Sequence, residues 1–300
     1  MKNKKSLLMV LAGYVIWGVL PLYWHALSGI DPIVILCCRI VMSAVCTTLL
    51  LFVTGRLGEL WAVMRNKQLM KFLIPAALTV TVNWGVYIWA VSAGHVTDSS
   101  LGYYMNPLVV FLFGSLIFKE RCGKMELVAL LLAAAGVLLT TLQYGAFPYI
   151  AITLAVSFAL YGMFKKFAHV DGTVSIAVET IVLFPAALLF LLLSPQTSAA
   201  IATATPLQFV FLLLAGIVTA APLIMYTQGV NGLPFITMGF LQYVCPTLML
   251  ILGVAIMGEP FSVAKAVSFA FIWAGLILFS VGMIKREKKQ AALEAAAEQG

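Results

Sequence analysis

Charged residues are scarce in this sequence. Only 10% of its 300 residues are Asp, Glu, Lys or Arg, while 63% are hydrophobic. A soluble globular domain carries about 25% charged residues. This shortage of charge excludes an ordinary soluble domain and indicates that most of the chain lies in lipid.

Histidine and cysteine are also few, and neither type is spaced for metal binding. The chain has three His and five Cys, with no CxxC pair, no HExxH motif and no phosphate-binding glycine loop. A membrane-embedded enzyme would need converging acids, bases or metal ligands. We therefore expect no enzyme activity, no metal and no cofactor, although an enzyme or a sensor without a soluble domain remains the alternative hypothesis. The basic residues form no patch interleaved with aromatics, so we expect no nucleic-acid partner.

Long apolar runs are what the sequence has in abundance. A helix needs about 20 apolar residues to cross a hydrocarbon core of about 30 Å, and ten runs approach this length. They lack the alternation of barrel strands, so we predict an all-α integral membrane protein with ten transmembrane helices. These cover residues 6–27, 32–53, 72–91, 99–118, 125–142, 148–164, 173–193, 209–228, 236–257 and 263–284.

Lysine and arginine are distributed unevenly between the ends of these helices. If the first helix runs outward, all but two of the 18 basic residues lie on the inner side, including Lys165 and Lys166. The two exceptions are Lys265, on the outer side, and Arg39, inside a helix. Because cytoplasmic loops are enriched in Lys and Arg, we predict that both termini are cytoplasmic.

The second half of the chain resembles the first. The segment "NPLVVFLFGSLIFKE" (106–120) aligns with "CPTLMLILGVAIMGE" (245–259), which pairs Pro107 with Pro246. Each half holds five predicted helices, and an odd number makes the second half enter the membrane in the opposite sense. We predict a 5+5 inverted-topology repeat, with one repeat over 1–145, another over 146–285, and a basic, Ala-rich cytoplasmic tail over 286–300. This architecture is typical of transport about a central site.

The two paired prolines fall inside the fourth and ninth predicted helices. Each proline removes a backbone hydrogen bond and bends its helix. Corresponding breaks in two halves point to the binding region, so Pro107 and Pro246 are predicted to mark it. The alternative is that proline is simply more frequent in membrane helices.

Six segments, in order along the chain, resemble the RarD family. They are "YVIWG" (14–18), "NWGVYIWAV" (83–91), "SLGYYMNPLV" (100–109), "YGMFKK" (161–166), "ETIVLFP" (179–185) and "GFLQYVCPTL" (239–248). This family belongs to the EamA-type branch of the drug/metabolite transporter superfamily.

The resemblance implies a ten-helix permease of the plasma membrane that transports small organic molecules by efflux, and that is associated in the family with chloramphenicol sensitivity or resistance. It also implies a cavity lined by the first, third, fourth, sixth, eighth and ninth helices. The expected partners are a small-molecule substrate and the lipid bilayer, and a homodimer remains open.

Polar and aromatic residues inside the predicted helices are the candidate cavity residues, because a polar group in lipid needs a partner or water. Aromatic walls with a few amides suit an uncharged or zwitterionic, partly apolar solute. The alternatives are aromatic belts at the interface and amides that bind helices together. The candidates are Tyr14, Trp17, Asn83, Trp84, Tyr87, Tyr103, Asn106, Tyr161, Tyr226, Gln242 and Tyr243.

Arg39 and Glu179 are the two ionisable residues that the sequence places clearly inside helices. Each follows by eight residues an Asp that is suited to cap its helix, Asp31 and Asp171, and so lies about 12 Å deep. Arg39 is a candidate for a functional or gating role or for a structural anchor, and three environments are open to it: an ion pair with Glu179, a contact with carbonyls or a ring face, or snorkelling to the outer interface. Glu179 is the acid placed to act as a proton carrier, which would require a raised pKa.

Overall fold

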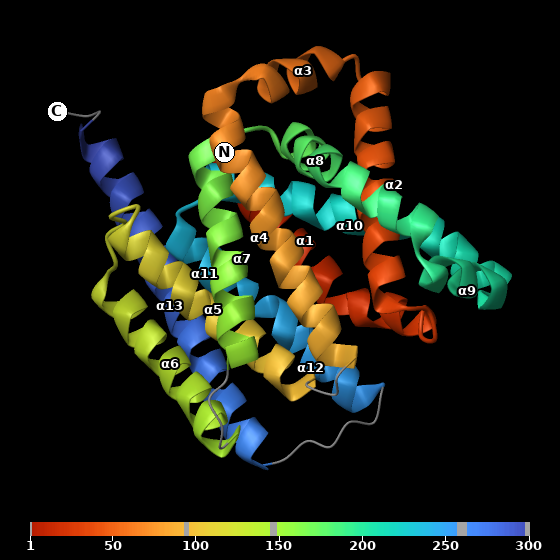
Figure 1. Cartoon of the computed structure of the whole chain (residues 1–300). Helices are drawn as coiled ribbons and strands as arrows, with labels where there is room; N and C mark the ends of the chain where they lie inside the picture. The colour runs from red at the N-terminus through yellow and green to blue at the C-terminus, as the bar shows by residue number, and fades with distance from the viewer. Residues whose placement is uncertain (1, 93–95, 145–148, 257–262, 298–300) are drawn as a thin grey trace.

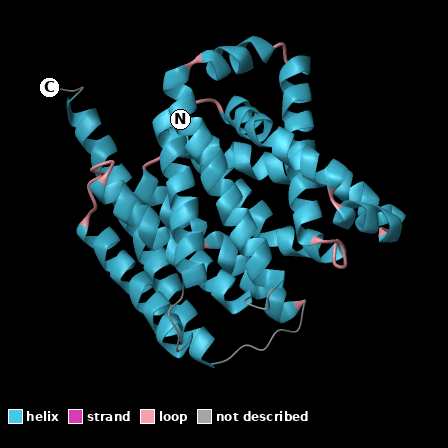
Figure 2. Cartoon of the chain, viewed as in Figure 1, coloured by secondary structure: helices cyan, strands magenta, loops and turns pink. Residues whose placement is uncertain are grey.

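Helices make up all the regular structure of the chain within the residues that the computed structural model describes, 2–92, 96–144, 149–256 and 263–297 (Figure 2). The predicted all-α class is confirmed. The helices are α1 (Lys2–Ala26), α2 (Pro32–Val53), α3 (Leu57–Arg65), α4 (Lys67–Ser92), α5 (Val96–Leu116), α6 (Lys124–Tyr144), α7 (Tyr149–Ala168), α8 (Gly172–Leu193), α9 (Pro195–Thr203), α10 (Pro206–Gly232), α11 (Phe235–Gln242), α12 (Val244–Ala255) and α13 (Val263–Ala297).

Several of these helices are long and apolar enough to cross a membrane. Among the described residues, seven segments meet this description by length and composition: Lys4–Ala26, Pro32–Val53, Lys67–Tyr87, Tyr149–Ala168, Gly172–Leu193, Pro206–Gly232 and Phe235–Leu252. Two shorter apolar helical segments, Gly102–Leu116 and Ala270–Gly282, accompany them. The chain is a multi-pass membrane protein.

The helix starts follow local capping chemistry. The Asp31 carboxylate accepts hydrogen bonds from the backbone N–H of Ile33 at 2.8 Å and of Val34 at 3.3 Å, at the start of α2. Asp171 does the same at the start of α8, where it accepts from Thr173 at 3.0 Å. Such caps satisfy donors that the first helical turn leaves unpaired. The predicted capping role of both aspartates is confirmed.

Two short helices were not predicted from the sequence. α3 and α9 each have nine residues, and they follow α2 and α8 respectively. α9 begins with Pro195 at its first position, and the Ser194 hydroxyl accepts from the N–H of Gln196. Proline and a serine cap favour a helix start at this point. Both helices are too short to cross a membrane, which is why a search for long apolar runs passes over them.

The predicted helix over 236–257 is divided in the structure. α11 ends at Gln242 and α12 begins at Val244, on either side of Tyr243. Pro246 has no N–H to donate to the carbonyl of Gln242, four residues earlier, so the regular ladder is interrupted at this point. α5, by contrast, continues as one helix across Pro107.

The two halves of the chain interleave. α1 packs against α10 and α12, α2 against α8 and α10, α4 against α7, α5 against α7 and α11, and α6 against α13. Each of these contacts joins a helix of the first half to a helix of the second. In Figure 1, α6 and α13 lie side by side along one edge of the molecule, and α2, α8, α9 and α10 lie on the opposite side. The helices α1, α4, α5, α7, α11 and α12 lie between these two groups, and α3 lies across one end.

Candidate functional site

A cavity lies among α1, α4, α5, α7, α11 and α12, with one side chain from α2, and it encloses about 810 Å³ of empty space including its open mouth. Eight of the predicted cavity residues line it: Tyr14, Trp17, Asn83, Trp84, Tyr87, Tyr103, Asn106 and Gln242. Arg39 also lines it. The wall therefore contains seven aromatic residues, six aliphatic, sulfur-containing or small residues, three amides and one cation.

The cavity lies toward one end of the helix bundle. Trp24 lies two residues before the end of α1, and Tyr87 lies five residues before the end of α4. Arg39 and Tyr103 lie in the first half of α2 and of α5. The lining residues thus gather near the end where α1 and α4 finish and where α2 and α5 begin.

The two asparagines both line the cavity and connect helices. The Asn83 side-chain N–H₂ donates to the carbonyl of Leu154 at 2.9 Å and to the hydroxyl of Ser157 at 3.0 Å, both on α7. The Asn106 N–H₂ donates to the carbonyl of Ala155 at 2.5 Å, while its Oδ1 is buried without a partner. The amides therefore fix α4 and α5 on α7 and leave the Asn106 acceptor unsatisfied.

Several lining residues were not predicted: Leu20, Pro21, Trp24, Gly102, Leu154, Phe158, Cys245 and Met249. Most of them are apolar, and an apolar residue in so apolar a chain carries no signal of its own. Trp24 is different, because it lies seven residues after Trp17 and two helical turns place both residues on one face of α1. That spacing could have identified it.

Three predicted residues do not reach the cavity wall. The Tyr161 and Tyr226 rings stack with centroids 5.9 Å apart, and Tyr226 also contacts the Trp17 ring at 5.7 Å, so the pair lies behind the wall. Tyr243 turns away, and its hydroxyl donates to the carbonyl of Tyr104 at 3.3 Å.

The set of helices that line the cavity also differs from the expected one. Among the described residues α10, the eighth predicted helix, contributes none of the lining, and α2 contributes Arg39 instead.

Arg39 is held by three different helices. Its guanidinium carbon lies 4.5 Å from the ring centroid of Trp24 on α1 and 4.6 Å from that of Trp84 on α4. Its Nε donates to the hydroxyl of Thr219 on α10 at 3.0 Å. Stacking on indole rings and a side-chain hydrogen bond stabilise a cation away from water. Of the three environments that the sequence leaves open for Arg39, the structure shows the contact with ring faces.

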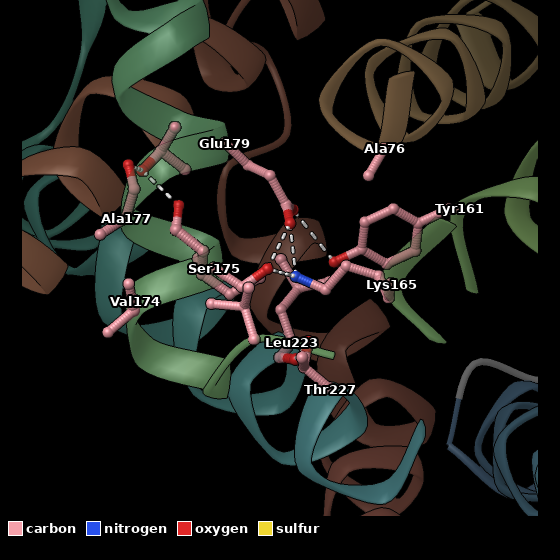
Figure 3. A network of polar contacts seen from close by, with 12 residues as sticks. Ala76, Tyr161, Lys165, Val174, Ser175, Ala177, Glu179, Leu223 and Thr227 are labelled. Atoms are coloured by element: carbon pink, nitrogen blue, oxygen red, sulfur yellow. Dashed lines mark hydrogen bonds and ion pairs between the residues drawn. The ribbon is translucent and has the colours of Figure 1, made fainter. Parts of the chain in front are cut away.

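Glu179 belongs to a separate buried cluster, formed with Lys165, Ser175 and Tyr161 (Figure 3). The Lys165 ammonium pairs with the Glu179 carboxylate, and the two side chains are 0% and 4% exposed. The hydroxyls of Ser175 and Tyr161 donate to the same carboxylate at 2.9 Å and 3.2 Å. Figure 3 shows all of these groups turned toward one another. The charges are paired and hydrogen-bonded, which is the condition for burying them.

This cluster corrects one interpretation of the sequence. The sequence places Lys165 among the basic residues that flank helices on the inner side and leaves Glu179 as a candidate partner for Arg39. The structure buries Lys165 inside the last turn of α7 and makes it the partner of Glu179. Arg39 instead contacts Trp24 and Trp84. A side chain near a helix end can face the neighbouring helix or the interface, and sequence position alone does not distinguish the two.

Glu120 forms a second polar link at the end of the bundle where α7 ends and α8 begins. Its carboxylate accepts from the Lys166 ammonium at 2.8 Å and from the backbone N–H of Phe235 and Ile236 at 2.6 Å and 2.8 Å. Those two N–H groups belong to the first turn of α11, which has no side-chain cap of its own. Glu120 therefore joins the end of α7 to the start of α11.

Asp171 forms a third link at this end. It accepts from the Gln228 side chain at 2.8 Å and pairs with Arg56 at 3.1 Å. Burial by itself would raise the pKa of Asp171, but the hydrogen bonds from Gln228 and Val174 and the charge of Arg56 outweigh it and lower this pKa. Polar links thus hold together the end of the bundle that lies opposite the cavity.

Comparisons with known proteins give a consistent result. Residues 4–142 match the model of the EamA-like transporter family. The chain is 38% identical to "Uncharacterized transporter YojE" of Bacillus subtilis (strain 168), over 95% of this chain and 96% of that one. It is 34% identical to "Protein RarD" of Escherichia coli (strain K12), over 96% and 98%.

Two further matches are more distant in sequence. "Chloramphenicol-sensitive protein RarD" of Pseudomonas aeruginosa is 28% identical over 96% of this chain and 97% of its own. A solved crystal structure superposes with a TM-score of 0.72 at 18% identity, covering 94% of this chain and 99% of that one. At that identity the superposition shows a shared fold.

Proposed function

The chain belongs to the RarD group of the EamA-like transporter family, and on that basis we propose that it is a secondary transporter that moves small organic molecules out of the cell by alternating access. The family membership makes it a membrane transporter of the drug/metabolite type. The substrate, the direction and the mechanism are the proposal. The observation that carries it is a cavity that lies at one end of the bundle, opposite an end that is closed by polar links.

The arrangement of helices supports an inverted repeat over residues 1–145 and 146–285. α2 and α8 both have 22 residues and an Asp cap, and each is followed by a nine-residue helix. The helix contacts also correspond between the two halves. The packing of α1 against α10 matches the packing of α7 against α4, and the packing of α5 against α7 matches the packing of α12 against α1. Two similar halves related in this way can rock about a site between them.

The direction of opening follows from the distribution of basic residues. With both termini in the cytoplasm of a bacterial cell and the chain in its plasma membrane, α7 ends and α8 begins on the cytoplasmic side. The polar links of Glu120, Asp171 and Glu179 then close the cytoplasmic end, and the cavity faces outward. In this state a solute carried from the cytoplasm can be released outside.

Counterflow tests the proposal. Purified protein is reconstituted into liposomes that are preloaded with a mixture of unlabelled metabolites or with chloramphenicol, and uptake of trace radiolabelled solutes is followed. Exchange that exceeds that of protein-free liposomes is expected for at least one solute. A loss-of-function variant carries Asn83→Leu and Asn106→Leu. These substitutions remove two cavity amides that also fix α4 and α5 on α7.

Exchange by this double variant is interpreted together with a measurement of its folding. If the double variant remains folded by size-exclusion chromatography, exchange should fall to the background. Correctly folded wild-type protein that exchanges none of the solutes would contradict the proposed function. Exchange in the double variant at the wild-type rate would show that the solute passes elsewhere.

A further inference from the structure

We propose that Arg39 is the anchoring residue for a carboxylate, so that the substrate is an organic monoanion with an apolar, ring-containing body. This inference rests on the proposed transport function, because it assigns the substrate class of the same cavity. The sequence alone favoured an uncharged or zwitterionic solute, since it did not place Arg39 in the cavity wall.

The charge balance of the cavity is the first argument. Arg39 lines the cavity, and no acidic side chain among the described residues pairs with it. The other lining residues are aromatic, aliphatic or neutral polar. Arg39 is partly buried within the bundle, and a cation at membrane depth without a counter-charge is costly. A monoanionic solute neutralises this site, a neutral solute leaves it charged, and a cationic solute is repelled.

The geometry of the guanidinium group is the second argument. Its carbon lies within 4.6 Å of the ring centroids of Trp24 and Trp84, and its Nε is engaged by Thr219. No described residue accepts a hydrogen bond from the two terminal nitrogens, Nη1 and Nη2. These two nitrogens form a planar pair of donors that matches the two oxygens of a carboxylate. The indole rings and Thr219 fix the group in advance, which reduces the entropy lost on binding.

An unsatisfied acceptor in the same wall also points to a ligand. Asn106 is 2% exposed, and its Oδ1 has no hydrogen-bond partner. A buried acceptor without a donor is unfavourable, and a hydroxyl or N–H of a bound solute would satisfy it. The surrounding rings, including the Tyr87 and Tyr103 pair at 5.8 Å, suit an apolar body. The cavity thus offers a donor pair, an acceptor and aromatic walls.

Calorimetric titration of the full-length protein in detergent tests this inference. The probes are three acids, phenylacetate, indole-3-acetate and cinnamate, each paired with its neutral amide of nearly the same shape. At least one acid is expected to bind about tenfold or more tightly than its amide, because a bidentate charge-assisted pair is lost in the amide. Chloramphenicol carries no charge, so it should compete with the bound acid no better than the amide.

Variants show whether Arg39 is responsible. Arg39→Gln should abolish the preference for the acid, and Arg39→Lys should retain part of it, because lysine keeps the charge without the planar donor pair. Arg65→Gln is the matched control, since Arg65 is an exposed arginine in the last turn of α3 that lies outside the cavity and outside the polar links. It should leave the preference unchanged.

Two results would overturn the inference: no acid binding in preference to its amide in the wild-type protein, or an acid preference that persists in Arg39→Gln. The wild-type comparison decides the matter even if the Arg39 variants do not fold. Solute exchange without an acid preference would discard this inference and keep the proposed function. Preferential acid binding without any solute exchange would discard the proposed transport function and keep Arg39 as a carboxylate-binding residue.

Discussion

The ion pair between Lys165 and Glu179 is the most deeply buried charge pair that the structure describes, with side chains 0% and 4% exposed. Removing two charges from water costs several kcal/mol for each ion, which the attraction between them only partly offsets. Such a pair contributes little net stability as a whole. Removing one partner, however, leaves the other charge buried and uncompensated.

Lys165→Met is therefore expected to lower the free energy of unfolding by about 3–5 kcal/mol. The double variant Lys165→Met with Glu179→Leu should recover most of that loss, because no uncompensated charge remains. Lys285→Met is the control at an exposed lysine of α13 and should change stability by less than about 0.5 kcal/mol. Thermal unfolding in detergent measures all three. A double variant less stable than Lys165→Met would show that the pair is itself strongly stabilising.

The sequence predicts single residues well where a polar group has one plausible environment. Asn83 and Asn106 were predicted inside helices, and they lie there with their amides bonded to α7. Lys165 could not be placed in the same way. Its position in the last turn of α7 is compatible with an exposed flanking charge and with a buried ion pair, and the choice depends on how α7 is rotated against α8.

The contact between α2 and α10 depends on a glycine. A Cβ atom added to Gly216 would lie 2.3 Å from the carbonyl carbon of Met42 and 2.4 Å from its oxygen. The Ser43 hydroxyl donates to the carbonyl of Gly216 at 3.2 Å. Small residues allow membrane helices to approach closely and to form such bonds. The same two helices carry Arg39 and Thr219, so their separation also sets the position of the guanidinium group.

Gly216→Ala is expected to destabilise the protein by about 1–3 kcal/mol, because the added methyl group forces α2 and α10 apart. Gly85→Ala is the matched control in α4, where an added Cβ meets no atom within 4 Å. It should be neutral or stabilising, since alanine favours helix over glycine by up to about 1 kcal/mol. Melting temperatures in one detergent compare the two. Equal melting temperatures would show that the helices adapt without cost.

Apolar length predicts where the long helices lie, and the starts of α2 and α8 at Pro32 and Gly172 follow from their Asp caps. Apolar length does not predict α3 and α9, which are too short to cross the membrane, or the break at Tyr243 between α11 and α12. Pro246 suggested a bend in one helix, as did Pro107 in α5. Whether a proline bends a helix or divides it depends on the packing around it, which the sequence does not contain.

At the scale of the whole molecule, the cavity and the polar links lie at opposite ends. The proposed orientation makes the cavity accessible from outside and not from the cytoplasm. Two positions are suited to test this arrangement. Leu20 lines the cavity and is partly exposed, and Cys122 is a partly exposed cysteine just before α6, in the connection from α5 that carries Glu120.

A variant that carries Leu20→Cys and lacks the five native cysteines should react with a membrane-impermeant methanethiosulfonate reagent in intact cells and much more slowly in inside-out vesicles. A variant that retains only Cys122 should show the opposite preference. The extent of labelling is read by the later addition of a fluorescent maleimide. Equal labelling of the Leu20→Cys variant from both sides would contradict the proposed orientation of the cavity, and labelling of Cys122 in intact cells would contradict the cytoplasmic location of its connection.

The hydrogen bonds of Glu120 have a consequence for the order in which the protein is assembled. The first turn of α11 has no cap from its own sequence, and its N–H groups at Phe235 and Ile236 bond to a carboxylate 115 and 116 residues earlier in the chain. During synthesis Glu120 emerges from the ribosome long before α11 does. The earlier part of the chain thus presents a ready acceptor, and α11 satisfies these two backbone groups by docking onto structure that has already been inserted.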